Sequence, residues 1–165
     1  TQLWRIIGRP PSPFIARETP MTTALTPVLN PEERLAATRH VMALCHDWGL
    51  GASDILTLLA LPDSVKPRHI PRFVEQEAFP DEVAVNRRLG YLARIEHALG
   101  TYFPRNPEMR ALWVKRGNRK FGRRPPVSVM IEDGETGLAA VLAHLDCTFA
   151  WDQTGSRTEY DERKG

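Results

Sequence analysis

The sequence predicts an all-α fold, a small helical bundle in which a helix–turn–helix-like part precedes a second helical module. Apolar residues recur at spacings of three and four in several segments, which is the period of one helix face. Residues that cap helix starts stand before these segments, and Gly or Pro stands after them. The 165 residues are 42% hydrophobic and 25% charged, which is ordinary for a soluble globular protein with a core of normal size.

The chain divides into an N-terminal arm at 1–30, a helix–turn–helix-like domain at 31–80, a second helical module at 81–151 and a polar tail at 152–165. The arm is expected to be extended or disordered, because "GRPPSPFIARETP" holds four of the chain's 14 prolines and has no helical period. Met21 resembles a natural translation start, which would make the residues before it an upstream extension.

The first two helices are predicted from their caps. Asn30 is a good N-cap, Pro31 suits the first helical position, and Gly49 ends the helix. Its inward face is formed by Ala37, Val41, Leu44 and Trp48. Ser53 is expected to cap a second helix that runs to Pro62, after a glycine-containing turn. This outline is that of a helix–turn–helix.

The next segment is where a DNA-binding helix–turn–helix would place its recognition helix. Its candidate DNA-binding residues are Lys66, Arg68 and Arg72. Pro67 and Pro71 allow only a short helix after Ile70. Glu75 and Glu77 would face phosphates unfavourably, which weakens the prediction of DNA binding.

The longest helix is predicted from about Asp81, a plausible N-cap, to the residue before Pro104. One apolar stripe consists of Val85, Leu89, Leu92 and Leu99, and an adjacent one of Tyr91, Ile95, Ala98 and Tyr102. Together they form a wide apolar face, so this helix is expected to be the central strut of the fold.

A further helix is expected after Asn106, with Met109, Leu112 and Trp113 on its buried side. Residues 105–124 contain one acid, Glu108, and eight basic residues: Arg105, Arg110, Lys115, Arg116, Arg119, Lys120, Arg123 and Arg124. The stretch 125–165 has eight acids and three bases. The basic segment suits an acidic partner or a nucleic acid. Equally, it could be a solvated face that the acidic part of the same chain balances.

The last part, "FGRRPPVSVMIEDGETGLAAVLAHLD", begins with a turn at Gly122 and a short helix after two prolines. Gly134 and Gly137 are expected to flank a turn before the final amphipathic helix. The inward residues of that helix are Leu138, Val141, Leu142 and Leu145. We expect His144 and Asp146 to hydrogen-bond to helix ends.

Motifs of chemistry are missing from the sequence. It contains no P-loop, no G-x-S-x-G and no HxxxH or HExxH pair, so we expect no enzyme, no cofactor and no metal site. Cys45 and Cys147 are interpreted as reduced, buried thiols. No window reaches the length of a membrane span and no signal-peptide pattern is present, so we expect a cytoplasmic protein without membrane partners.

One order of motifs resembles a known family. A long helix ending "HALGTYFP" precedes Trp113, Asn118, "FGRRPPVSVM", the turn "DGETG" and "LAAVLAHLD". Over about 81–151 this resembles the bacterial antitoxins of the MbcA/ParS/Xre group, which partner toxins of the RES-domain type. Residues 33–80 are similar to the divergent helix–turn–helix domain of those proteins. "FGRR" stands where many members have Gly-Gly before Ser/Thr-Pro, so this loop departs from the family pattern.

The resemblance implies an antitoxin that silences a neighbouring, NAD-using toxin by covering the mouth of its NAD pocket. The residues expected to bind the toxin are Trp113, Asn118, Phe121, Arg123, Arg124, Trp151, Arg157, Tyr160, Arg163 and Lys164. The last four could enter an NAD pocket from the tail, since Arg pairs well with carboxylates; the alternative is a tail without a role. The resemblance also implies that the N-terminal module pairs antitoxins into homodimers or binds operator DNA, and a stand-alone DNA-binding regulator is the competing hypothesis.

Overall fold

The structure, a computed structural model, describes the backbone of residues 29–154 and the side chains of residues 29–147. Within this part the chain is all-helical and has no strand, which confirms the predicted fold class. The α-helices are α2 (Pro31–Asp47), α3 (Ala52–Leu59), α4 (Ile70–Glu75), α5 (Val83–Tyr102), α6 (Pro107–Lys115), α7 (Pro126–Glu132) and α8 (Gly134–Thr154). Two 3-10 helices, η2 (Pro67–His69) and η3 (Arg119–Phe121), precede α4 and α7.

Helix α2 begins as predicted. The Asn30 side chain accepts a hydrogen bond from the Glu33 amide at 2.9 Å, and the Glu33 carboxylate accepts one from the Asn30 amide at 2.9 Å. This reciprocal capping box satisfies two amides that a helix start leaves without partners. On the predicted inward face, Ala37 and Val41 are buried and Leu44 is partly buried, and Trp48 just after the helix is also buried.

Helix α3 differs from the prediction at both ends. It begins at Ala52, with Gly51 in the N-cap position, and not after Ser53. The Asp54 carboxylate accepts the Gly51 amide at 3.0 Å, so the acid in the first turn serves where a Ser53 cap was expected. The helix ends at Leu59 because Ala60 adopts the left-handed conformation with φ 49°, ahead of the predicted stop at Pro62.

Helix α4 is short, as the two prolines of this segment predict. It has six residues, and its Ile70 and Phe73 are buried against the core. The rings of Phe73 and Phe79 are 5.0 Å apart, and the Arg39 guanidinium donates to the Glu75 carbonyl oxygen at 3.1 Å. Helix α4 therefore packs against α2 as a structural element of only one and a half turns.

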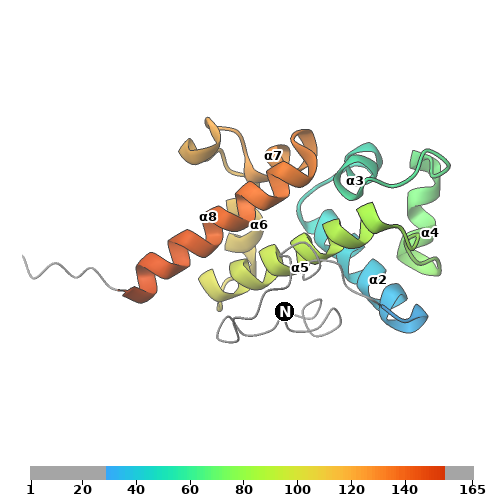
Figure 1. The fold of residues 1–165 in the computed structure, drawn as a ribbon, viewed down its shortest axis with the longest axis horizontal. Coiled ribbons are helices and arrows are strands. Elements are labelled where there is room, and N and C mark those ends of the chain that lie inside the picture. The colour runs from blue at the N-terminus through green and yellow to red at the C-terminus, as the bar shows by residue number, and fades with distance from the viewer. Residues whose placement is uncertain (1–28, 155–165) are drawn as a thin grey trace, which may run out of the picture.

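Helix α5 is the central strut that its two apolar stripes predict. It contacts α2, α3, α6 and α8, and it crosses the middle of the molecule in Figure 1. Val85, Leu89, Leu92 and Leu99 are fully or almost fully buried. It is not the longest helix, however: α8 has 21 residues and α5 has 20.

The predicted N-cap of α5 was wrong for a physical reason. Glu82 occupies that position, while Asp81 joins a polar network between α2 and α5. The Asp81 carboxylate accepts from Arg34 at 2.6 Å and from the Asn86 side chain at 2.7 Å. Arg34 also donates to Asn86 at 2.8 Å, so the almost fully buried guanidinium has partners on both sides. The network fixes the start of α5 against α2.

Helices α7 and α8 meet at a turn much tighter than predicted. Asp133 and Gly134 make the whole turn, because Gly134 adopts a positive φ of 61° and is already the first residue of α8. Gly137 lies inside α8 and not in a loop. A Cβ atom at Gly137 would clash with the Val129 carbonyl oxygen and lie 2.8 Å from its carbon, so this glycine lets the two helices touch. The predicted inward residues of α8 are all buried.

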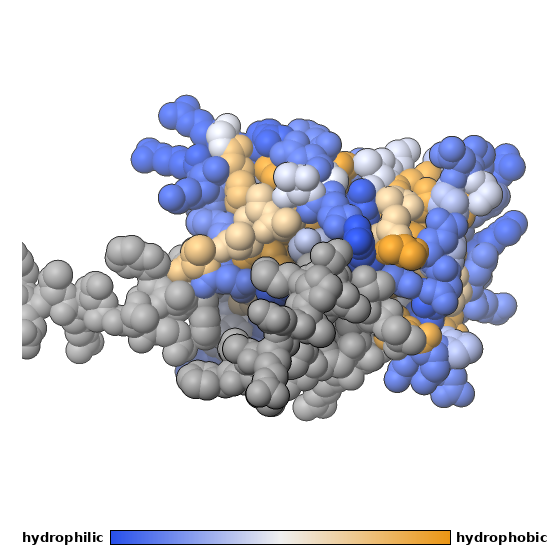
Figure 2. Space-filling model, in the orientation of Figure 1, coloured by the Kyte–Doolittle hydropathy of each residue, from blue (hydrophilic) through white to orange (hydrophobic). Residues whose placement is uncertain are grey.

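The two cysteines have different environments. Cys45 is buried as expected, and burial raises the pKa of its thiol to about 12. Cys147 is exposed, so the expectation that it is buried was wrong. It belongs to a face of α8 where the exposed residues are small, including Ala140 and Ala143, and Figure 2 shows a weakly hydrophobic strip along this helix.

Candidate interaction site

The face of α6 that packs against the core is opposite to the predicted face. Its buried residue is Val114, which has no exposed surface, whereas 38% of Met109 and 47% of Leu112 are exposed. Trp113 is half-buried. Val114 and the partly buried Ala111 are three residues apart, so they share the helix face away from Met109 and Leu112. Helix α6 has nine residues and packs mainly against α5 and α7, so it strongly buries one side. Here that side carries the smaller apolar residues.

The start of α6 explains this orientation. The Asn106 side chain caps the helix by accepting the Met109 amide at 3.1 Å. The Arg110 guanidinium donates to the carbonyl oxygens of Phe103 at 3.0 Å and Pro104 at 3.3 Å. The cap and these two bonds tie the first turn of α6 to the end of α5. They leave Met109 and Leu112 facing solvent.

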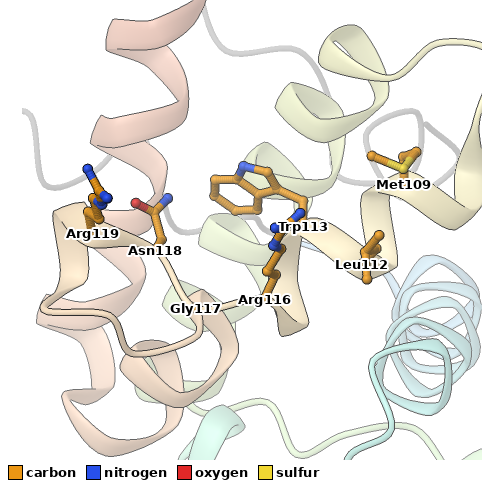
Figure 3. Close-up of a pocket in the computed structure, with 7 residues that line it drawn as sticks. All are labelled: Met109, Leu112, Trp113, Arg116, Gly117, Asn118 and Arg119. Carbon is orange, nitrogen blue, oxygen red and sulfur yellow. The ribbon is translucent and has the colours of Figure 1, made fainter.

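A surface cavity of about 350 Å³ lies beside this exposed face. Its lining residues are Met109, Leu112, Trp113, Arg116, Gly117, Asn118 and Arg119. Figure 3 shows that the apolar side chains come from α6, while Gly117, Asn118 and Arg119 come from the segment that follows. Apolar walls and cationic groups therefore share one opening. We call this the α6 cavity.

The hydrogen bonds of Asn118 hold together the segment that forms one wall of the α6 cavity. Its side-chain oxygen accepts the Lys120 amide at 2.9 Å, and its carbonyl oxygen accepts the Phe121 amide at 3.1 Å and the Arg123 amide at 2.9 Å. Its own amide donates to the Arg124 carbonyl oxygen at 3.1 Å. Asn118, predicted as a direct contact for a partner, thus has a second role in holding the loop closed.

Gly117 is needed for the same closure. A Cβ atom at Gly117 would lie 2.6 Å from the Arg123 carbonyl oxygen, which belongs to the backbone and cannot swing away. Arg123 itself adopts a left-handed conformation with φ 68°. A non-glycine residue keeps a positive φ only where the surrounding contacts determine the backbone conformation, so this turn has a defined shape.

His144 of α8 forms the support behind the α6 cavity, a role that the sequence did not reveal. Its ring stacks on Trp113 with 6.2 Å between centroids and 15° between planes, and it meets the edge of Phe121 at 5.4 Å. Its Nε2 lies 3.4 Å from the Asn118 side-chain nitrogen. Burial, and then the charge of Lys120, lowers the pKa of His144, which favours the neutral ring.

His144 and Asp146 were expected to hydrogen-bond to helix ends, but both lie inside α8 and not at its end. Asp146 faces Arg94 of α5, with 3.5 Å between the charged groups. His144 stands three residues after the buried Val141, at the edge of the inward stripe, and this spacing is the signal that could have placed it near the core.

Arg124 and Arg123 are neighbours in the sequence but make different contacts. The Arg124 guanidinium binds Asp133 at 2.8 Å and Glu132 at 3.0 Å, at the end of α7. These bonds raise the pKa of Arg124, and the same contact lowers the pKa of Asp133. Arg124 therefore has an intramolecular partner, whereas Arg123 is exposed on the turn.

The balance of charge between the basic segment and the acidic part is local and incomplete. In the part of the chain whose side chains are described, Arg124 is the basic residue of 105–124 that pairs with acids of α7. Glu135 and Asp146 pair with arginines of α5 instead. The exposed residues of the basic segment that make no ion pair within residues 29–147 include Arg116, Arg119, Lys120 and Arg123. We call these four the basic turn.

The residues predicted to bind DNA lie elsewhere. All three are exposed: Lys66 lies just before η2, Arg68 is in η2 and Arg72 is in α4. The Arg68 side chain approaches the ring of its neighbour His69 at 3.3 Å. Glu75 is exposed on the same short helix. The structure thus places these cations on an element distinct from the α6 cavity.

The structure brings together part of the predicted toxin-binding set. Trp113 and Asn118 line the α6 cavity, Phe121 packs behind it on His144, and Arg123 is on the basic turn. The side chains of Trp151, Arg157, Tyr160, Arg163 and Lys164 lie outside the described residues. In residues 29–147 no cluster of three His, Cys, Asp or Glu side chains is placed to hold a metal ion. In the described part of the chain, no helix has the length and apolar character needed to cross a membrane.

Comparison of the chain with the models of known protein families and with curated proteins finds no match.

Proposed function

We propose that this chain is the antitoxin of a toxin–antitoxin pair and that it neutralises a RES-type toxin by direct contact. The order of motifs from "HALGTYFP" to "LAAVLAHLD" supports the family. The structural observation that carries the proposal is the α6 cavity beside the basic turn. Large apolar side chains are exposed there beside cations that pair with no acid of residues 29–147, and such a combination is typical of surfaces that bind another protein.

The proposed action needs no chemistry from this chain. The toxin uses NAD, and its NAD pocket must stay open to substrate. An antitoxin that docks beside the pocket and covers its mouth lowers the toxin's activity in proportion to its occupancy. In this proposal the tail from Trp151 onward reaches the pocket, where Arg157 and Tyr160 supply the blocking side chains.

The test is co-expression with the protein encoded next to this chain. The neighbour alone should stop growth, and co-expression should restore growth and give a complex that co-purifies. Removing residues 152–165, or changing Trp151 or Tyr160 to Ala, should abolish rescue. Rescue that survives all three changes would contradict occlusion by the tail, while a harmless neighbour would contradict the antitoxin proposal itself.

A second candidate function is a DNA-binding regulator. The observation that favours it is the exposure of Lys66, Arg68 and Arg72 on neighbouring elements, where phosphates could reach them. We expect such binding to weaken steeply as salt is raised, because each phosphate contact releases counterions. A gel-shift titration of the promoter region at two salt concentrations, with all three residues changed to Ala, checks it. Binding that is equal for this variant and for the unchanged chain would exclude this surface.

A further inference from the structure

The α6 cavity has a chemistry that identifies the kind of segment it can bind. We infer that it receives an apolar side chain from an acidic segment of a protein partner, with carboxylates of that segment paired to Arg116 and Arg119. This inference rests on the proposed function in one respect, that the chain acts by binding a protein. It adds which surface binds the partner and what the bound segment must contain.

The apolar wall argues for a polypeptide as the occupant. Met109 and Leu112 are 38% and 47% exposed, so both leave apolar surface in contact with water instead of facing the core. Trp113 adds an indole whose ring already packs on His144. Nucleic-acid surfaces are read mainly through phosphates and base edges, and they gain little from an aliphatic wall of Met and Leu. An apolar side chain would fill this wall and exclude water from it.

The cationic rim argues for acids on the same occupant. Arg116 and Arg119 line the cavity, and Lys120 and Arg123 extend the charge along the basic turn. Arg124 shows what happens where acids are within reach, because Glu132 and Asp133 bind its guanidinium. Within residues 29–147 no carboxylate does this for Arg116 or Arg119. Complementary charge supplied by a partner would increase both the association rate and the selectivity.

The frame around the cavity is fixed before any partner binds. Asn118 makes its loop bonds with amides and carbonyl oxygens of the same turn, and Gly117 lies in tight contact with the Arg123 carbonyl oxygen. His144 supports Trp113 from behind. A site whose walls are already ordered loses little conformational entropy on binding, which favours useful affinity from a short segment.

The other apolar surface in view does not compete with this one. The exposed side of α8 carries small residues, including Ala140, Ala143 and Cys147, and nothing in the structure indicates what would cover them. The α6 cavity, by contrast, is concave and has both apolar walls and positively charged lining residues.

The experiment is a selection from a random peptide library displayed on phage, performed on the full chain. Peptides are kept if they bind the unchanged chain and are removed if they bind the variant Leu112→Asp/Arg119→Glu. We expect enriched peptides to share a Leu, Ile, Met or Phe flanked by Asp or Glu. Their affinity should fall about tenfold or more for Leu112→Asp and for Arg116→Glu.

Matched variants separate the cavity from general effects of charge and apolar surface. Arg105 is exposed in the same basic segment but does not line the cavity, and Val83 is 66% exposed at the start of α5. Arg105→Glu and Val83→Asp should bind the selected peptides within about twofold of the unchanged chain. All these positions are exposed, so thermal unfolding should show that the variants remain folded.

Several results would overturn the inference. One is a selection that enriches no peptide, and another is enriched peptides that contain no Asp or Glu. A third is peptides whose affinity for the Leu112→Asp variant equals that for the unchanged chain. Binding of a DNA duplex that Arg116→Glu abolishes and Leu112→Asp leaves intact would assign the surface to nucleic acid instead. The selection uses no toxin, so its failure is distinct from a failure of rescue by co-expression.

Discussion

Val114 and Leu112 test the orientation of α6, because the two neighbouring residues should affect different properties. Val114 has no exposed surface, so Val114→Ala removes two buried carbon groups at about 0.8 kcal/mol each. The cavity left behind raises the loss of unfolding free energy to about 2 kcal/mol. Leu112 is 47% exposed, so Leu112→Ala should cost below about 1 kcal/mol.

The assay is thermal unfolding followed by circular dichroism, combined with measurement of the affinity for the selected peptides. Val114→Ala should lower the melting temperature by about 4–8 °C and change binding within about twofold. Leu112→Ala should do the reverse, with nearly unchanged stability and binding about tenfold weaker. If Leu112→Ala destabilises the protein as much as Val114→Ala does, then the exposed face of α6 is wrong, and with it the α6 cavity.

Three further predictions follow from the same contacts. Gly137→Ala should destabilise by about 1–2 kcal/mol, because the clash with the Val129 carbonyl outweighs the gain of about 1 kcal/mol in helix propensity; increased stability in urea would contradict this. Asn118→Ala should weaken peptide binding and loosen the turn, seen as faster amide exchange at Lys120, and unchanged exchange would refute its role. The pKa of His144 is lowered by burial, so the unfolded chain binds the proton more readily. Stability should be full above the ordinary pKa near 6.5 and fall below it, and His144→Gln should flatten that slope in melts at several pH values.

The sequence predicts the parts of the fold whose determinants are local. The start of α2 follows from Asn30 and Glu33, which satisfy each other's backbone amides. The stripes of α5 follow from a long helical period, and the short α4 follows from two prolines. The predicted N-cap of α3 was wrong by two residues, because Gly51 occupies that position and the Asp54 carboxylate accepts its amide.

The parts that the sequence does not predict depend on tertiary contacts. The period of α6 offers two faces, and the larger apolar side chains favour the one that is in fact exposed. Gly137 reads as a loop residue beside Gly134, yet it marks where the Val129 backbone touches α8. The error in α6 falls at the candidate site, and such a local inconsistency is expected where a surface is kept for binding.

The sequence therefore predicted some of the residues that line the α6 cavity and assigned others to the wrong place. Trp113 and Asn118 were identified from the order of motifs, and both line it. Met109 and Leu112 were assigned to the core, although they form its wall. His144 was given a helix-end role, because a sequence cannot show that Trp113 and Phe121 would meet its ring.

The most direct test of the account is growth of cells that express the neighbour-encoded protein together with this chain or with its Leu112→Asp/Arg119→Glu variant. We expect the neighbour alone to arrest growth and the unchanged chain to restore growth and co-purify with it. The variant should do neither, although it stays folded. Full rescue by the variant would contradict binding through α6, and growth of cells with the neighbour alone would contradict the proposed antitoxin function.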